Sequence, residues 1–161
     1  MDKREFEKSD LIFEAPFATL GVKLESNIIT EIQFSPAIHQ QRINNSQAKS
    51  IVEDFNQYFS DATHVFQSPT YLKGTLFRRK VWQQLTLIPC GQTRTYGELA
   101  SAIHSSPRAI GGACRHNPIP VIVPCHRVVA RNGNGGYAGS TSGFLMEIKR
   151  WLLKHEGVID V

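Results

Sequence analysis

One cysteine of this chain lies among residues that could make it a reactive thiol. Cys125 follows a short apolar run and Pro124, and His126 comes directly after it. A cysteine reacts as its thiolate, and a free thiol near neutral pH is only a few per cent ionised, so it needs a base nearby. His126 is the obvious base, and the pair predicts nucleophilic chemistry at Cys125.

The apolar run over residues 119–123 predicts a short strand that delivers Cys125 to the bottom of a pocket. Neighbouring side chains of an extended segment point to opposite faces, so a water molecule could link the Cys125 thiol to the His126 imidazole. The alternative is a structural pair, in which Cys125 is a small buried apolar residue and His126 a hydrogen-bonded core histidine. The proline before the cysteine, the arginine after the histidine and the glycine-rich stretch 131–143 favour the reactive pair.

A catalytic histidine needs a third group that orients its imidazole. The second half of the chain offers four acidic residues, Glu98, Glu147, Glu156 and Asp160. Glu98 is expected to cap a helix, and Glu147 is expected on the exposed side of the last helix. Glu156 is therefore the preferred partner of His126.

The charges divide unevenly along the chain. Residues 1–70 hold six Lys and Arg against ten Asp and Glu, a net charge of −4, whereas residues 71–161 hold twelve against four, a net charge of +8. The positive half is the one that carries the cysteine and the histidine. Such an excess favours a polyanion as the partner, and nucleic acid is the leading candidate.

Length and composition fit a globular protein of one domain or two small ones. The 161 residues are 41% hydrophobic and include neither an apolar signal segment nor a run of membrane-spanning length, so we expect a cytoplasmic protein without a membrane partner. Cys90, Cys114 and Cys125 show no metal-ligand or disulfide spacing. We therefore expect reduced thiols and no metal.

The first half predicts a small α/β unit. Three β-type runs are expected, over residues 11–13, 18–24 and 28–34. A hairpin turn at Ser26 and Asn27 joins the last two runs, and an amphipathic helix is expected over 48–59. Nothing in this half indicates a reactive group, and His39 and His64 are expected at the surface.

The second half predicts a series of helices, over residues 76–85, 96–103, 108–116 and 144–155. Thr95 and Glu98 form a capping box at the start of the second helix. The second and third helices, joined by a tight turn, are a helix-turn-helix candidate. Gly111 and Gly112 indicate that another backbone or a ligand approaches the third helix closely, because glycine costs a helix about 1 kcal/mol relative to alanine.

Several motifs of this half resemble the O6-alkylguanine-DNA alkyltransferases. They are PCHRV at residues 124–128, Asn-Pro at 117–118, WLLKHEG at 151–157, TYGELA at 95–100, and Phe77-x-Arg79-x-Val81-Trp82. The resemblance covers about residues 75–157, and the first seventy residues match only in general character. It implies a mixed α/β (α+β) fold, with a ribonuclease-H-like α/β domain over 1–70 and a winged-helix-like, helix-turn-helix domain over 71–161.

The resemblance implies a direct-reversal DNA-repair protein. Such a protein flips an O6-alkylguanine, or less readily an O4-methylthymine, out of duplex DNA and takes the alkyl group irreversibly onto its own cysteine. Carried over to this chain, Cys125 is the alkyl acceptor, His126 is a water-mediated base, and Glu156 holds and polarises that histidine. Asn117 braces the active-site turn. Tyr96 crowds the phosphate of the target and is the candidate proton donor to the leaving guanine.

The resemblance also assigns residues to the DNA and to the flipped base. Arg108 is implied to fill the gap left by that base, on a helix that enters the minor groove. Backbone or rim contacts are assigned to Arg79, Arg115 and Arg131. The guanine pocket is assigned to Tyr137, Ala138 and Cys114. No cofactor and no metal are implied, and the partner is double-stranded DNA containing O6-alkylguanine, bound by a monomer.

Two other functions and one departure from the family pattern are kept open. A non-catalytic lesion-binding relative would carry another residue in place of Cys125, and a Cys-His hydrolase would need an oxyanion hole and true turnover. The stretch from Tyr137 to Trp151 is longer than in the family, with extra residues at 140–144. The range of accepted alkyl groups therefore stays open, although the small Ala138 suggests a roomy pocket.

Overall fold

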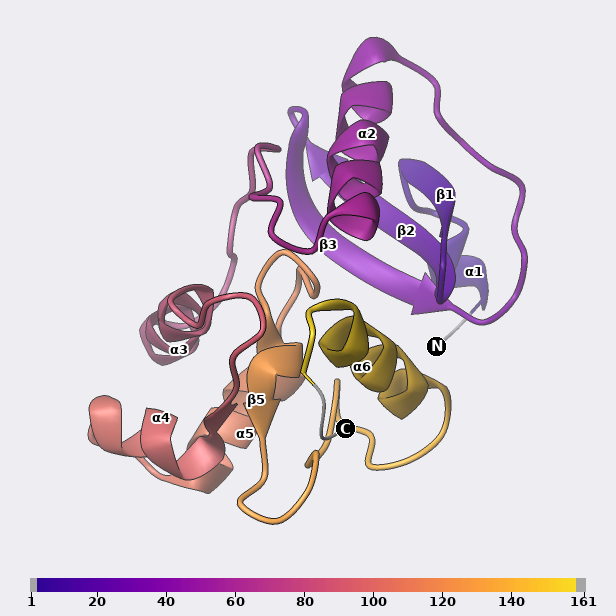
Figure 1. The fold of residues 1–161 in the computed structure, drawn as a ribbon. Coiled ribbons are helices and arrows are strands. Elements are labelled where there is room, and N and C mark those ends of the chain that lie inside the picture. The colour runs from indigo at the N-terminus through magenta and orange to yellow at the C-terminus, as the bar shows by residue number, and fades with distance from the viewer. Residues whose placement is uncertain (1–2, 159–161) are drawn as a thin grey trace. The chain divides into compact units, whose positions relative to one another are not determined.

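The computed structural model describes residues 3–158 and separates into two units, Met1–Leu72 and Lys73–Val161. The N-terminal unit holds a short helix, an antiparallel sheet and one longer helix (Figure 1). Their bounds are α1 Lys3–Phe6, β1 Leu11–Ala15, β2 Ala18–Glu25, β3 Ile28–Ser35 and α2 Ser46–Ser60. The three predicted strands and the predicted helix are confirmed.

The sheet has the order β1-β2-β3, and both strand pairs are antiparallel. Ser26 and Asn27 join β2 to β3 with φ angles of 51° and 65°, the left-handed conformation that a two-residue hairpin turn requires. The predicted turn is therefore confirmed. Phe13 of β1 and Phe55 of α2 pack with their ring centroids 5.3 Å apart, so the helix covers one face of the sheet.

The prediction that His39 and His64 lie at the surface is wrong. Both are half-buried, and each has a polar partner: His39 Nε2 lies 2.8 Å from Ser35 Oγ, and His64 Nε2 lies 2.6 Å from Asp54 Oδ1. A histidine in an irregular segment can pack its ring and still satisfy a buried polar group, which local sequence does not reveal.

The C-terminal unit is mostly helical, with one very short parallel sheet. Its elements are α3 Leu76–Thr86, β4 Arg94–Thr95, α4 Tyr96–Ala102, α5 Pro107–Arg115, η1 Cys125–Arg127, β5 Val128–Val129 and α6 Phe144–His155. All four predicted helices are present, and the mixed α/β fold class is confirmed. Among residues 3–158, none of the helices combines the length and the apolar character needed to cross a membrane.

Local signals and one sheet pairing place the functional segments of this unit. The capping box is confirmed, because Thr95 Oγ1 accepts from the Glu98 N–H at 3.1 Å and the Glu98 carboxylate accepts from the Thr95 N–H at 2.6 Å. β4 pairs with β5 in parallel, with Arg94 opposite Val128. The start of α4 is thereby held next to the segment that follows η1.

The predicted strand over residues 119–123 is wrong. These residues form a turn, with a bridge between Pro120 and Val123 and a φ of 77° at Val121, and Cys125 then begins one turn of 3-10 helix. Proline has no N–H to give to a sheet, so an apolar run flanked by two prolines can be buried without being extended. Cys125 and His126 therefore do not lie on a strand, and the alternation of side chains expected for a strand does not apply to them.

Candidate active site

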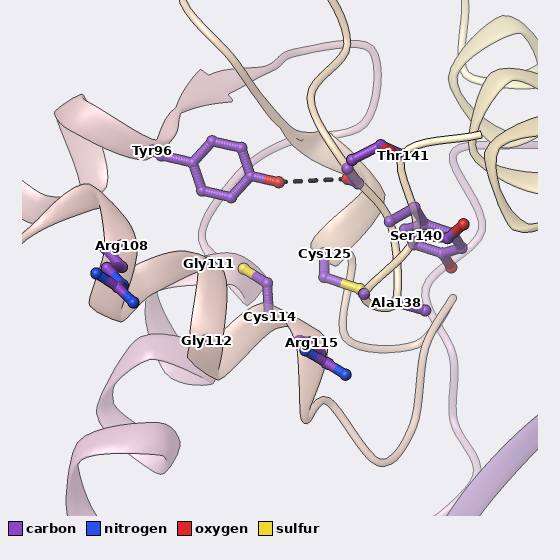
Figure 2. A pocket seen from close by; sticks show the side chains of 13 residues that line it. Tyr96, Arg108, Gly111, Gly112, Cys114, Arg115, Cys125, Ala138, Ser140 and Thr141 are labelled. Carbon is purple, nitrogen blue, oxygen red and sulfur yellow. Dashed lines mark hydrogen bonds between the residues drawn. The ribbon is translucent and has the colours of Figure 1, made fainter.

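Cys125 is almost fully buried within the C-terminal unit, with 4% of its surface exposed. Its side chain reaches a cavity of about 370 Å³, which α4, α5, η1 and the loop 136–141 surround (Figure 2). This size is typical of a site for a small molecule. Residues assigned above that also line the cavity are Tyr96, Arg108, Cys114, Arg115, Tyr137 and Ala138.

Asn117 ties the turn before Cys125 to the thiol itself. Its Nδ2 donates to the Val123 carbonyl at 2.8 Å and to Cys125 Sγ at 3.1 Å, and its Oδ1 accepts from the Ile119 N–H at 3.1 Å. A donor at this distance favours the thiolate over the thiol. The same amide therefore fixes the conformation of the turn and stabilises negative charge on sulfur.

The structure brings Glu156 to His126, as expected. His126 Nε2 lies 2.8 Å from Glu156 Oε1, and both side chains are fully buried. The other candidate acids lie elsewhere: Glu98 caps α4, Glu147 is exposed on α6, and Asp160 lies outside the described residues.

Burial and neighbouring charges set the protonation of this pair. Burial would raise the pKa of the Glu156 carboxyl, but hydrogen bonds and charge from His126 and Arg127 hold that pKa well below its usual range. Burial lowers the pKa of His126, and the opposing effect of Glu156 does not cancel this. A neutral imidazole that donates from Nε2 to a carboxylate has Nδ1 as its acceptor. Nδ1 is buried and has no hydrogen-bond partner among the described residues.

Arg127 was given no role in the sequence reading, yet it completes this buried group. Its Nε donates to Glu156 Oε2 and its Nη2 to Glu156 Oε1, both at 2.8 Å, while Nη1 donates to the Ile88 carbonyl. Such a two-point contact fixes the plane of the carboxylate. The Glu156 carboxylate is thus positioned by Arg127 while it orients His126.

Lys149 is a second residue that the sequence reading missed. It is fully buried on α6, and its Nζ donates to the carbonyls of Val128 at 2.6 Å, Asn134 at 2.6 Å and Gly136 at 3.0 Å. Burial lowers its pKa to about 8. The sequence does indicate this burial, because Lys149 lies three residues after Met146 and four before Leu153, on the apolar face of the helix.

The two thiols of the cavity differ in the polar groups that surround them. Burial raises the pKa of Cys125, whereas hydrogen bonds from Asn117 and Tyr137 and the charge of Lys149 oppose that rise. Burial and the neighbouring Cys125 raise the pKa of Cys114, and only Lys149 opposes this. Cys125 is therefore the better candidate for the nucleophile.

Tyr96 stands at the edge of the cavity with its hydroxyl protonated. The hydroxyl donates to the Gly136 carbonyl at 3.3 Å, the dashed contact of Figure 2. Burial raises the pKa of Tyr96 to about 12. At neutral pH this group can therefore donate a hydrogen bond to a molecule in the cavity.

The assigned arginines separate into two groups. Arg108 and Arg115 of α5 line the cavity, whereas Arg79 and Arg131 are exposed residues that do not line it. Between the first two, a side chain added at Gly112 would meet no protein atom within 4 Å. The close neighbour expected at this glycine is therefore not another part of the described protein, and this face of α5 is open.

Metal-binding side chains are not clustered in the part of the chain that the structure describes. Within residues 3–158, no three His, Cys, Asp or Glu side chains group in a way that could hold a metal ion.

Comparisons with known proteins identify the family of this chain. The family described as "6-O-methylguanine DNA methyltransferase, DNA binding domain" matches residues 76–158. A methylated-DNA–protein-cysteine methyltransferase of Shigella flexneri is 40% identical over 123 residues, which cover 74% of this chain and 69% of that protein. One from Sulfolobus acidocaldarius is 31% identical over 147 residues, covering 91% of this chain and 92% of that protein.

Solved structures agree over most of the chain. The O6-methylguanine methyltransferase of Mycobacterium tuberculosis matches with a TM-score of 0.76 and 31% identity, covering 90% of both chains. An OGT of the same organism, solved in complex with DNA, matches with a TM-score of 0.75 and 31% identity, covering 91% of both chains.

Proposed function

Because this chain belongs to the O6-methylguanine DNA methyltransferase family, we propose that it moves the alkyl group of an O6-alkylguanine in DNA onto its own Cys125. The protein is a DNA-repair methyltransferase and binds DNA. O4-methylthymine is a second, lesser substrate. The choice of acceptor is supported above all by one observation: a buried thiol that reaches a cavity, is hydrogen-bonded by Asn117 and adjoins the His126–Glu156 pair.

A base stacked inside a duplex cannot reach a thiol that is 4% exposed, so the damaged base must leave the stack. Flipping a base costs a few kcal/mol, and a lesion that weakens pairing lowers this cost. Arg108 enters the gap, and the open face of α5 at Gly112 lets the helix approach the narrow minor groove. Arg79, Arg115 and Arg131 contact the backbone or the rim of the site.

The transfer begins with the proton of Cys125. Through a water molecule this proton passes to Nδ1 of His126, and the Glu156 carboxylate stabilises the resulting imidazolium. Sγ then bonds to the alkyl carbon while the bond from that carbon to O6 breaks, and the electron pair passes to the guanine. Tyr96 gives the guanine a proton and regains one from the imidazolium, so the products are an S-alkylcysteine and an unmodified base.

No step of this sequence cleaves the new thioether, so each protein molecule reacts once. All the residues named belong to the C-terminal unit, to which we assign DNA binding and transfer. We further propose that the protein acts as a cytoplasmic monomer. Within the described residues Cys114 and Cys125 form no disulfide, which is compatible with a reducing compartment.

The intact mass of the protein after incubation with DNA tests this function. Excess duplex containing one O6-methylguanine should add one methylene unit per protein and restore one guanine for each protein consumed. The same duplex without the lesion is the control. Binding without a change in mass would instead support a non-catalytic lesion-binding protein, and repair of more than one lesion per protein would indicate a hydrolase.

A further inference from the structure

We propose that Lys149 is a positioning residue of the transfer reaction, which holds the pocket loop to the strand after the nucleophile and keeps a positive charge beside the two pocket thiols. The inference rests on the proposed function, because it concerns how the same Cys125 is prepared for attack. The buried ammonium group of Lys149 makes three hydrogen bonds.

The three carbonyls that Lys149 binds come from two separate segments. Val128 is the first residue of β5 and directly follows η1, whereas Asn134 and Gly136 belong to the glycine-rich loop. An ammonium group has three donors, and here each of them has an acceptor. Lys149 therefore ties α6, the nucleophile's segment and the loop together at one atom.

The loop held in this way forms part of the cavity wall. Gly136 lines the cavity and accepts a second hydrogen bond, from the Tyr96 hydroxyl. The loop then continues through Tyr137 and Ala138, which line the cavity as well. A shift of the Gly136 carbonyl would therefore move the pocket wall and the proton donor together.

A purely structural role does not explain why this position carries a charge. Burying an ammonium is costly, and an apolar residue of similar volume would suit the apolar face of α6 better. Among the described residues, no carboxylate forms an ion pair with Lys149. Its charge is balanced by carbonyl dipoles alone, so it remains available to an anion that forms nearby.

The titratable groups that Lys149 influences all belong to the site. They are Cys125 and His126 of η1 and Cys114 of α5. The positive charge opposes the rise in pKa that burial causes at both thiols, and it adds to the fall in the pKa of His126, which helps to keep the imidazole neutral. The effects on Cys125 and His126 favour a thiolate beside a neutral imidazole.

Three variants separate the effect of the charge from that of the hydrogen bonds. Lys149→Met removes both, whereas Lys149→Arg keeps the charge but does not place three N–H donors on one nitrogen atom. Lys154→Met, which removes an exposed lysine of the same helix, is the matched control. For each variant, single-turnover methyl transfer from an O6-methylguanine duplex is measured between pH 6 and 9. Duplex affinity and the iodoacetamide reactivity of the Cys125 peptide are followed in parallel.

Lys149→Met should transfer about tenfold more slowly near neutral pH, because losing the positive charge leaves a smaller fraction of Cys125 as the thiolate. Its deficit should shrink as the pH rises, but its rate should stay below the wild-type value at every pH, because the three hydrogen bonds are missing as well. Its duplex affinity should stay unchanged. Lys149→Arg should keep the wild-type thiol pKa but react more slowly at every pH, since a planar guanidinium cannot aim three N–H groups from one atom. Lys154→Met should match the wild type.

The proposal is overturned if folded Lys149→Met keeps the wild-type rate, or if it slows equally at every pH with an unchanged thiol pKa. Should Lys149→Met fail to fold, Lys149→Arg decides: a wild-type rate at every pH would refute the positioning role. A wild-type protein that transfers nothing would refute the proposed function instead, so the two failures can be told apart.

Discussion

Each unit of this protein buries one carboxylate against a histidine, and the two pairs serve different ends. Asp54 Oδ1 lies 2.6 Å from His64 Nε2 in the N-terminal unit, and Glu156 Oε1 lies 2.8 Å from His126 Nε2 in the C-terminal unit. Both carboxylate residues are only 6% exposed. The pairs themselves are nearly alike.

The remaining partners of each carboxylate make the difference. Asp54 accepts from the backbone N–H groups of Gln67 and Ser68 and from the Ser68 hydroxyl, so it fastens the segment after α2. Glu156 is held by Arg127, and its histidine directly follows Cys125. Only the C-terminal pair therefore adjoins a thiol in the chain, because no cysteine occurs before Cys90.

The largest effect is expected from Glu156→Gln. The amide cannot balance the charge of Arg127, and it no longer requires the Nε2-protonated form of His126. We expect the transfer rate to fall about a hundredfold and the free energy of unfolding to fall by about 3 kcal/mol. Single-turnover transfer and urea unfolding measure the two. A wild-type transfer rate in Glu156→Gln would show that Glu156, like Asp54, has a structural role alone.

The matched substitution in the N-terminal unit, Asp54→Asn, should affect stability alone. Losing hydrogen bonds to a charged acceptor should lower the free energy of unfolding by about 2 kcal/mol. The transfer rate should stay within about twofold of wild type, because the hydrogen-bond partners of Asp54 all belong to the N-terminal unit. The comparison between the two pairs would break if this variant lost transfer while its unfolding curve stayed unchanged.

A smaller effect is expected from Arg108→Ala, which tests whether the C-terminal site must open DNA. Transfer from an O6-methylguanine duplex should slow about tenfold if the flipped base is no longer replaced in the stack. Affinity for undamaged duplex should change only about twofold, because many phosphate contacts share it. Free O6-methylguanine base, which needs no flipping, should react as with wild type. An equal loss with duplex and free base would remove the flipping role.

The smallest effect concerns acid stability. Burial would raise the pKa of Asp54 and of Glu156, but their hydrogen bonds, and in Glu156 also nearby positive charge, lower both. Each carboxylate therefore contributes stability that is complete above its unfolded pKa and is lost as the pH falls below it toward the folded pKa. The lowered pKa of His126 acts in the same direction below pH 6.5, where the unfolded chain binds a proton first.

This pH dependence can be measured by urea unfolding between pH 7 and pH 3. Over this range, Asp54→Asn and Glu156→Gln should each lose about 1 kcal/mol less stability than wild type. If the free energy of unfolding of Glu156→Gln changed with pH as it does in wild type, Glu156 would not be charged in the folded protein. A wild-type dependence on pH in Asp54→Asn would likewise contradict a lowered pKa for Asp54.

Features with local causes could be predicted from the sequence. The capping box of Thr95 and Glu98 and the turn at Ser26 and Asn27 each depend on a few consecutive residues, and the structure contains both. Glu156 is preferred in the sequence because Glu98 and Glu147 are expected elsewhere, and the structure brings Glu156 to His126. The motifs around Cys125 indicated the family, which the comparisons confirm.

Features that depend on distant partners could not be predicted in this way. Arg127 and Lys149 are cations, which are exposed in most proteins, and their burial is explained only by partners from other segments. The apolar run before Cys125 predicts a strand, but it forms a turn, because hydrophobicity indicates burial and not backbone conformation. His64 was misplaced for a similar reason, as its partner Asp54 lies on another element.

The identity of the alkylated sulfur tests the central claim most directly. Cys125→Ser and Cys114→Ser change two thiols of one cavity, so either substitution perturbs the same site. After reaction with an O6-methylguanine duplex, digestion and mass spectrometry of the peptides locate the methyl group. We predict that Cys114→Ser takes one methyl group on Cys125, whereas Cys125→Ser takes none and still binds the duplex. A methyl group on Cys114, or on any residue of Cys125→Ser, would contradict the account.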